Sequence, residues 1–538
     1  MEREKFRIPC SVQDAIPIRR IFADGIFQVG NQYSKTWSFT DINYAIASKE
    51  DKTSMFLDYS ELLNALDSGA SAKITIYNRR INKAEFERSV LLPDKDDGLD
   101  EYRHEFNRML TAQVTGTSNS IVRERYLTVS VVKRNADEAR SYFSRVGTDL
   151  VTHLAQLSSV ATELTLTERL HIFRDFFKAG EQAAAEFNIH EHARRGQHFK
   201  DWFCPDSMEF AADHFKLDAR YGRVLYLQDY ASYIKDSFVS ELCDLDRDLM
   251  LSVDILPVPT DEAAHQLQST LLGVETNVAN WQRRQNANNN FTATIPYDME
   301  LQRKETKEML DDLTTRDQRM MFGLVTLVHL ADSKEQLDSD TETLYSTARK
   351  HLCQLSTLRW QQKDGLDTVL PYGLRKVQAL RTLTTESTAV LIPFRAQEIM
   401  QPNGLYYGQN AVSKNMIVAD RRLLLNGNSF RLGVSGSGKS MSAKEEIVQI
   451  ALSTEDDILI LDPESEFGYL TEALGGEVIR ISATSDTHIN ALDMDRAYGD
   501  ERNPIVSKSE FVLSLFEQLI GDGMVTAKEK SILGRCTE

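Results

Sequence analysis

Cysteine is scarce in this sequence, and its placement fits no cross-linked scaffold. The five cysteines are widely spaced, their number is odd, and no Cys-x-x-Cys occurs. This pattern indicates free thiols in a reducing cytosol rather than a disulfide framework. The small secreted domains that depend on disulfide bonds are therefore excluded as a class.

Long hydrophobic runs are also missing. No stretch approaches the ~20 apolar residues that span a bilayer, and the charged N-terminus, MEREKFRIPCSVQ, has no apolar signal core. The longest apolar stretch, near Met320–Leu330, predicts a buried strand. We therefore expect a cytoplasmic chain without an intrinsic transmembrane segment, which reaches a membrane through a partner.

Basic residues are outnumbered, because 62 Lys and Arg stand against 80 Asp and Glu and give a net charge of −18. An acidic surface repels the DNA backbone on average, so nonspecific DNA coating is disfavoured, although a local basic channel remains compatible. With 538 residues, 41% hydrophobic and 26% charged, the chain has the composition of a soluble protein of several domains.

Residues 1–385 predict an N-terminal α+β domain. A hairpin is expected around Gly30, a helix near Asp261–Gln282, and strands at Lys73–Tyr77, Val224–Leu227 and Leu249–Val258. Two segments about 195 to 198 residues apart, 126–163 and 322–360, share a strand, a helix and a closing Gln-Leu-Ser. This echo predicts two related units with a ferredoxin-like arrangement.

Several polar features are better explained as solvated surface than as sites. The acidic run Asp94–Glu101 lacks the ligand spacing of a calcium loop, and the run Arg283–Asn290 predicts a connector. His190, His192, His198 and Cys204 fit no zinc template. The tryptophans Trp202, Trp281 and Trp360 are scattered, and core positions are favoured over a base-stacking platform.

A second domain, 386–538, is expected to follow, beginning with a strand at Ala389–Phe394. Its main motif is Gly433-Val434-Ser435-Gly436-Ser437-Gly438-Lys439-Ser440, which satisfies GxxxxGK[ST]. An entering strand is expected at Asn428–Leu432 and a helix at Met441–Leu452. The motif and its flanks predict the start of a RecA-like P-loop domain, so the expected fold class is α/β.

The chemistry of phosphate binding explains these residue types. Gly433, Gly436 and Gly438 let the backbone curl around phosphate, and the amides from about Ser435 to Ser440 point inward at a helix N-terminus. Lys439 is expected to meet the β and γ phosphates, and the Ser440 hydroxyl to ligate Mg²⁺. Residues 433–440 are therefore the predicted nucleotide-binding site, with ATP and Mg²⁺ as ligands.

A second motif follows the P-loop helix. Ile458–Leu461 predicts a short buried strand that ends in Asp462-Pro463-Glu464-Ser465-Glu466, and Val478–Ile481 predicts another strand. Asp462 has the position of a Walker B carboxylate, which would hold magnesium-bound water. Only 22 residues separate it from Lys439, and in many motor ATPases those carboxylates lie on a later strand. We expect the ATPase domain to be cut short in this chain.

The P-loop, the Asp462–Glu466 segment, the run Gly404–Asn410 with Asp420 and Asn426–Asn428, and Arg316–Met320 together resemble the conjugative-transfer ATPases of type IV secretion systems. The resemblance is to TraE-like and TrbE-like members of the HerA/FtsK superfamily, in particular those on mobile elements of Gram-positive bacteria. It covers most of the chain. The P-loop is generic, and the other segments are moderately specific.

The resemblance implies a hexameric ATPase on the inner face of the cell membrane, working with membrane components of a secretion channel and with DNA or a relaxase. It implies catalytic roles for Lys439 and Glu466 and metal-binding roles for Ser440 and Asp462. In this family the Walker B pair lies downstream of Asp462, which places it past residue 538. Binding and hydrolysis are therefore separate expectations.

Three functions remain open at this point. The leading one is a motor ATPase that powers assembly or DNA–protein transfer in conjugation. A DNA-pumping coupling protein is the second, although that class carries transmembrane helices near its N-terminus. The third is a scaffold that binds nucleotide as a structural switch without turnover.

Overall fold

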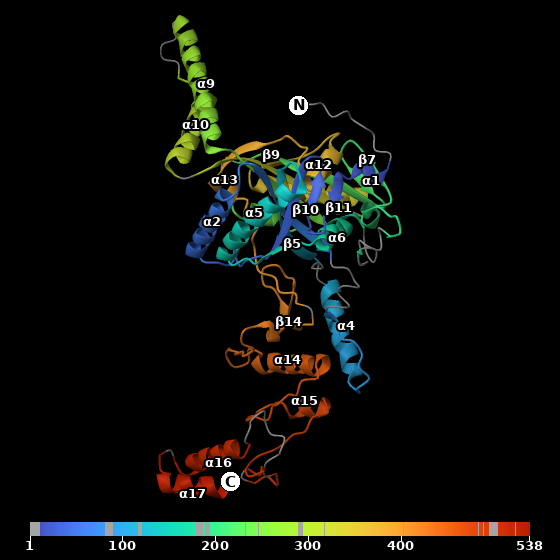
Figure 1. The fold of residues 1–538 in the computed structure, drawn as a ribbon, viewed down its shortest axis with the longest axis vertical. Helices are drawn as coiled ribbons and strands as arrows, with labels where there is room; N and C mark the ends of the chain where they lie inside the picture. Colours follow the sequence, from blue (N-terminus) through green and yellow to red (C-terminus); the bar gives the residue numbers. More distant parts are fainter. Residues whose placement is uncertain are drawn as a thin grey trace. The chain divides into compact units, whose positions relative to one another are not determined.

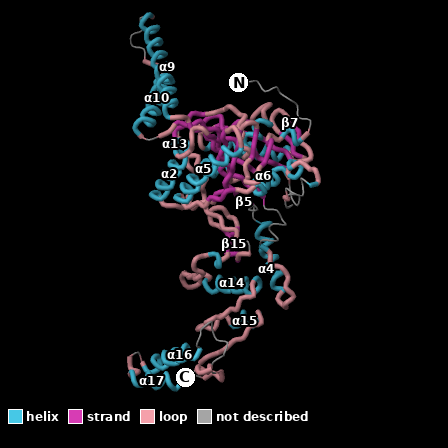
Figure 2. The backbone as a smooth tube through the Cα atoms, in the orientation of Figure 1, coloured by secondary structure: helices cyan, strands magenta, loops and turns pink. Residues whose placement is uncertain are grey.

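The computed structural model describes residues 11–80, 90–116, 121–178, 187–188, 194–231, 233–245, 247–288, 294–316, 318–401, 403–482, 484–487, 489–493, 504–521 and 523–537. The chain divides after Phe430 into two compact units (Figure 1). Strands are gathered in the first unit, and from α14 onward Figure 2 shows helix and loop. Helix and strand are mixed around a large sheet, which confirms the α/β class.

The first half of the first unit runs from α1 to α6. Its elements are α1 (Val12–Ala15), β1 (Ile18–Ile21), β2 (Phe27–Val29), β3 (Gln32–Phe39), α2 (Lys49–Asn64), β4 (Ala70–Arg80), α4 (Asp100–Gly116), β5 (Ile121–Val132), α5 (Ala136–Gln156), β6 (Ala161–Glu163) and α6 (Leu166–Phe177). The hairpin predicted around Gly30 is the β2–β3 turn, where Gly30 has a φ of 61°.

The second half repeats this order. It comprises η2 (Phe199–Trp202), β7 (Met208–Phe210), β8 (Phe215–Leu217), β9 (Arg220–Asp229), α8 (Phe238–Leu242), β10 (Leu249–Pro257), α9 (Thr260–Ala287), α10 (Tyr297–Thr315), β11 (Met320–Ala331), α11 (Lys334–Lys350), β12 (Gln354–Thr357) and α12 (Gln362–Val369). The unit continues with β13 (Arg381–Thr384), α13 (Thr385–Ala389), β14 (Leu405–Gln409), β15 (Met416–Ala419) and η3 (Arg421–Leu423).

Strand pairing shows that each half contains a ferredoxin-like βαββαβ unit. In the first, β6 pairs with β3, β3 with β5 and β5 with β4; in the second, β12 pairs with β9, β9 with β11 and β11 with β10. The last strand therefore lies beside the first, the third beside the second, and all pairs are antiparallel. The two ferredoxin-like repeats meet where β4 pairs with β10, so one sheet of 13 strands results.

The repeat is more extensive than the sequence echo indicated, because the hairpins β1–β2 and β7–β8 and the helices α6 and α12 also correspond. The shared Gln-Leu-Ser is misleading in detail: Gln156 ends α5, whereas Gln354 begins β12. The reason is helix length, since α5 has 21 residues and α11 has 17.

A row of hydroxyl side chains crosses the sheet at right angles to the strands. The register pairs its members from one edge to the other in the order Thr162, Ser38, Tyr126, Thr75, Ser252, Thr326, Tyr226 and Ser356. Its middle is the junction of the two ferredoxin-like repeats, where the Thr75 and Ser252 hydroxyl oxygens lie 2.8 Å apart. Ser252 donates to the Val369 carbonyl at 2.6 Å, so the middle of the row is part of the packed interior.

Each face of the sheet has its own core. On one face, alternate residues such as Ile74, Leu127 and Val253 pack against α2, α5, α8 and α11. On the other face, Tyr77, Met250 and their neighbours pack against α6 and α12. Both faces are buried, which explains why β11 reads as one continuous apolar run.

Two sequence predictions in this unit fail locally. Ala389–Phe394 is not a strand, because α13 ends at Ala389 and Leu391, Ile392 and Phe394 enter the core as separate anchors. Arg283–Ala287 is the last part of α9 rather than a connector; Asn289 and Asn290 lie outside the described residues. The acidic run Asp94–Glu101, in contrast, is largely an exposed turn, as predicted; it ends inside α4, and Asp97 and Asp100 pair with buried Arg103.

The predicted boundary near 385 differs from the division after Phe430. Tyr406 of β14 and Val418 of β15 form a small core with Leu110 of α4. The β14–β15 hairpin is thereby tied by apolar packing to the first unit.

Buried His329 makes the stability of this unit depend on pH. Its Nε2 lies 3.1 Å from the Thr341 hydroxyl, which itself donates to the Leu337 carbonyl, so Nε2 carries the hydrogen; Nδ1 has no hydrogen-bond partner. Burial, with the nearby Arg223 charge, lowers the pKa of His329 from 6.5 to about 3. The unfolded chain therefore binds a proton below pH 6.5 that the folded chain takes up only near pH 3.

We expect His329→Gln to flatten this dependence. For the wild type, the His329 contribution falls by about 1.4 kcal/mol per pH unit as pH decreases from 6.5 toward 3. Urea unfolding at pH 7 and pH 5 should show about 2 kcal/mol less loss in the variant than in the wild type. Exposed His104 offers the control, His104→Gln; equal losses in wild type and His329→Gln would contradict the expectation.

Candidate phosphate-binding site

The second unit contains α14 (Lys439–Ser453), α15 (Gly468–Ala473), α16 (Pro504–Ile520) and α17 (Ala527–Thr537). Its described residues form no strand, so the strands predicted at Asn428–Leu432, Ile458–Leu461 and Val478–Ile481 are absent there. A strand needs neighbours for its backbone hydrogen bonds, and these segments have none among the described residues. Their side chains are accordingly open to solvent, with Leu432 91%, Leu459 90% and Ile481 67% exposed.

The loop Gly433–Ser440 nevertheless has a defined local conformation. Gly436 and Gly438 adopt left-handed φ values of 76° and 90°, which side chains rarely tolerate. The Ser437 amide donates to the Val434 carbonyl at 3.2 Å, and α14 begins at the next lysine. A Cβ atom on Gly433 would lie 2.4 Å from the Ser437 hydroxyl oxygen, so a side chain at this position requires that hydroxyl to rotate away.

Lys439 crosses from the end of this loop to its beginning. Its Nζ donates to the Gly433 carbonyl at 2.9 Å, so the ammonium of this exposed residue lies against the loop. The first amides of α14 have no acceptor within the helix, and the helix dipole makes this end positive. Together they provide what an oxyanion needs: several N–H donors and one cation. The predicted glycines, Lys439 and Ser440 are all brought together here.

The carboxylates of the second motif are placed differently. Asp462 accepts the Phe467 amide at 2.8 Å, and this bond, with further amides of residues 464–466, lowers the pKa of Asp462. Asp462 is therefore a turn-capping anion before α15. Glu466 is exposed. Among the described residues, neither carboxylate makes a hydrogen bond or ion pair with the loop.

The capped turn does contact the P-loop helix. The Lys444 ammonium of α14 lies 5.3 Å from the centre of the Phe467 ring. The segment that resembles the family motif is thus adjacent to α14 through a cation–π contact rather than through its carboxylates.

The sequence reasoning missed one pair that supports the loop. Arg431, two residues before Gly433, forms an ion pair with Glu446 of α14 and donates to the Ser442 hydroxyl at 3.3 Å. Glu446 is 5% exposed, so this acid on a helix face is held by the arginine. The signal in the sequence was an acidic residue, Glu446, on the face of the predicted helix that is buried. Both contacts tie the chain entering the loop to the helix leaving it.

The described residues contain no group of three or more His, Cys, Asp or Glu side chains able to hold a metal ion. Of the candidate histidines, His198 accepts the Lys200 amide as a helix cap, while His190 and His192 lie outside the described residues. Burial raises the pKa of Cys204 to about 12, which keeps its thiol protonated. A magnesium ion that binds together with a nucleotide needs fewer protein ligands, since phosphate oxygens, water and one hydroxyl group suffice. Ser440 fits that requirement.

No protein-family model and no curated protein matches this sequence. The described part of the chain includes no helix that combines the length and apolarity of a membrane-spanning segment.

Proposed function

We propose that the chain binds a nucleoside triphosphate, ATP with Mg²⁺, at Gly433–Ser440. The observation that carries the proposal is the loop itself: two glycines in left-handed conformations, a third packed against the Ser437 hydroxyl, and a lysine bridging the loop at the start of a 15-residue helix. Loops of this kind direct their amides at phosphate oxygens.

Each residue has a separate task in this proposal. The amides of Ser435 to Ser440 hold the phosphates, and Lys439 exchanges the Gly433 carbonyl for the β and γ phosphate oxygens. Ser440 ligates Mg²⁺, which neutralises phosphate charge when bound. Glu446 and Arg431 keep the loop in register with α14.

We further propose ATP hydrolysis coupled to conjugative DNA–protein transfer or to assembly of a type IV secretion channel. The resemblance of the P-loop, Asp462–Glu466 and the preceding segments to that ATPase family supports this role. On this proposal Lys439 and Glu466 act in catalysis and Asp462 holds magnesium-bound water. Copies assemble, as hexamers in the family, at the inner face of the membrane beside channel components, DNA or a relaxase.

A nucleotide-binding scaffold without turnover is the second candidate. The hydrogen bonds that Asp462 accepts from its own turn favour it, since this carboxylate is already engaged. Hydrolysis by the chain would require Asp462 or Glu466 to approach the γ-phosphate.

Ser440→Ala tests the metal-dependent part of the proposal. We expect Mg²⁺ to strengthen ATP binding by the wild type, measured by calorimetry with Mg²⁺ and with chelator, and we expect most of this gain to be lost in the variant. The matched control is Ser453→Ala, at the other end of α14, which should keep the gain. Equal Mg²⁺ dependence in wild type and Ser440→Ala would refute the role of Ser440.

Steady-state phosphate release by the wild type distinguishes the two candidates. Release above the level of a Lys439→Ala variant supports the ATPase. Tight ATP binding with release no higher than that variant supports the scaffold.

A further inference from the structure

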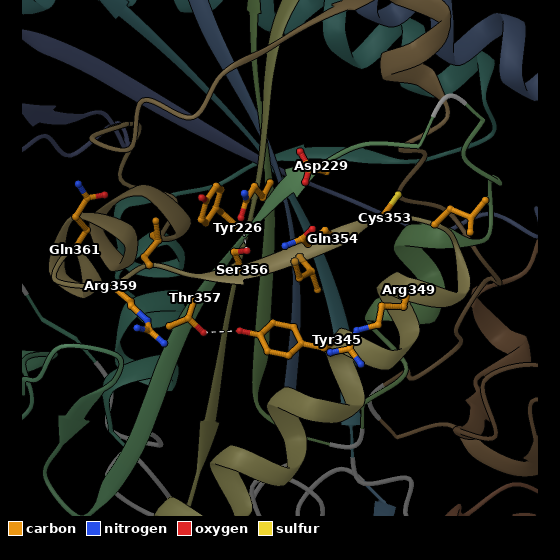
Figure 3. Close-up of a pocket in the computed structure, with 14 residues that line it drawn as sticks. Tyr226, Asp229, Tyr345, Arg349, Cys353, Gln354, Ser356, Thr357, Arg359 and Gln361 are labelled. Atoms are coloured by element: carbon orange, nitrogen blue, oxygen red, sulfur yellow. Dashed lines mark hydrogen bonds between the residues drawn. The ribbon is translucent and has the colours of Figure 1, made fainter. Parts of the chain in front are cut away.

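Strand β12 forms an open edge of the large sheet. It pairs with β9 on one side, and no described strand pairs with the other. A hollow of about 1030 Å³ runs along this edge, between β9, α11 and the segment that follows β12 (Figure 3). Unpaired edges are a ready template for another strand.

The alternation of backbone hydrogen bonds along β12 shows which of its N–H and C=O groups face away from β9. The Leu358 amide donates to the Val224 carbonyl of β9 at 3.2 Å, and Ser356 pairs with Tyr226 two residues further along. In an antiparallel ladder such groups alternate. The N–H and C=O groups of Leu355 and Thr357 therefore point away from β9, toward the open side.

Two bulky apolar residues flank the strand, each four positions along the chain from Ser356. Leu352 is 83% exposed and Trp360 is 84% exposed, the highest values for large hydrophobic side chains among the described residues of 11–401. Both also have left-handed φ values, 58° and 61°. The sequence favoured a core position for Trp360, and the structure corrects this. The left-handed φ of Leu352 is that of a residue just past the end of α11, whereas the exposure of two large apolar side chains at one edge points to a contact surface.

We propose that this edge binds the same edge of a second copy of the chain, antiparallel, around a twofold axis at Ser356. Leu355 then exchanges both backbone hydrogen bonds with the partner's Thr357, and the same exchange recurs across the axis. Leu352 meets the partner's Trp360 at one end, and Trp360 meets the partner's Leu352 at the other. An isologous contact of this kind is self-complementary.

The fold already contains a join of the same kind. β4 and β10, corresponding strands of the two repeats, pair antiparallel with Thr75 opposite Ser252. Ser356 ends the same row of hydroxyl side chains, so pairing it with the partner's Ser356 continues the row without a register shift.

Charged side chains of both signs, Arg349, Arg359 and Asp229, line the hollow. The proposal does not depend on nucleotide binding, because every residue that carries it lies before residue 361.

The test is sedimentation velocity of the whole chain without nucleotide, from about 1 to about 100 µM. We expect the wild type to approach twice the chain mass. Leu352→Lys and Trp360→Glu should each weaken association at least about tenfold, since each places charge in both ends of the contact. Leu272→Gln, which alters an exposed leucine of α9 (70% exposed), should change nothing.

A mixture of the two charged variants tests the register itself. In the mixed pair, the lysine introduced at position 352 of one copy faces the glutamate introduced at position 360 of the other. At the opposite end of the contact, the native Trp360 and Leu352 still meet. Mixing should therefore restore association that neither variant shows alone.

Three results would overturn this proposal: a wild type that remains monomeric, charged variants that associate normally, or a mixture of them that stays monomeric. A monomeric chain that captures an extended peptide instead would also overturn it, because the edge would then take a different occupant.

Discussion

Replacing Lys439 by alanine is expected to abolish triphosphate binding, with an affinity loss of about 100-fold or more for a fluorescent ATP analogue. The Lys439 ammonium lies at the loop, with its Nζ 2.9 Å from the Gly433 carbonyl. Charge-assisted hydrogen bonds to phosphate contribute about 1.5–3 kcal/mol each, and Lys439 is expected to make more than one.

The matched control for this experiment is Lys444→Ala on the same helix. Its ammonium lies over the Phe467 ring, 5.3 Å from the ring centre, so its loss should leave the phosphate site intact. The measurement is fluorescence anisotropy at fixed Mg²⁺. Unchanged affinity in Lys439→Ala would reject Gly433–Ser440 as the triphosphate site, whereas equal losses in both variants would indicate a general effect on α14.

Removing Asp254 is expected to cause the largest loss of folding stability. Its carboxylate lies 3.3 Å from the Lys73 ammonium, and the two side chains are 5% and 3% exposed. Lys73 also donates to the carbonyls of Thr368 in α12 and of Leu374, so the pair joins β4 and β10 to α12 and the segment after it.

Burial raises the pKa of Asp254 and lowers the pKa of Lys73, and in each case the partner's charge opposes the shift. Asp254→Ala leaves an ammonium in the interior without a counter-charge, which costs about 3–5 kcal/mol. Urea unfolding of the first unit, followed by circular dichroism, measures the change.

Two comparisons make this prediction specific. The double variant Lys73→Met/Asp254→Leu should recover most of the stability, because apolar replacements of a buried pair are often neutral. Asp312→Ala, which breaks the Arg316–Asp312 pair at the end of α10, should cost less than about 1 kcal/mol, because Arg316 is 72% exposed. A loss below about 1 kcal/mol in Asp254→Ala would contradict the structural role assigned to the pair.

Part of this molecule was predictable because its signals are local. The glycine spacing of Gly433–Ser440 implies a phosphate loop at a helix N-terminus, and the structure has both left-handed glycines and the helix. The sequence likewise predicted a strand followed by a helix within 126–163 and within 322–360, and these are β5 with α5 and β11 with α11. These features depend on residues within a few turns of each other.

Other features depend on partners far along the chain. Ile458–Leu461 has the composition of a buried strand, but composition does not provide neighbouring strands, and the segment is exposed. Trp360 is of a residue type that is usually buried in a core, but it lies at an open edge. The Arg431–Glu446 ion pair was hard to predict from sequence, because Glu446 is buried only through the packing of α14.

The sequence by itself determined the phosphate loop, the α/β class and the existence of a repeat, since each follows from spacing along the chain. The tertiary structure alone decided that the repeats join through β4 and β10, that Lys73 and Asp254 meet in the interior, and that β12 is left as an edge. Each of these results from pairing between segments roughly 100 or more residues apart, where backbone register and burial, rather than local composition, select the partner.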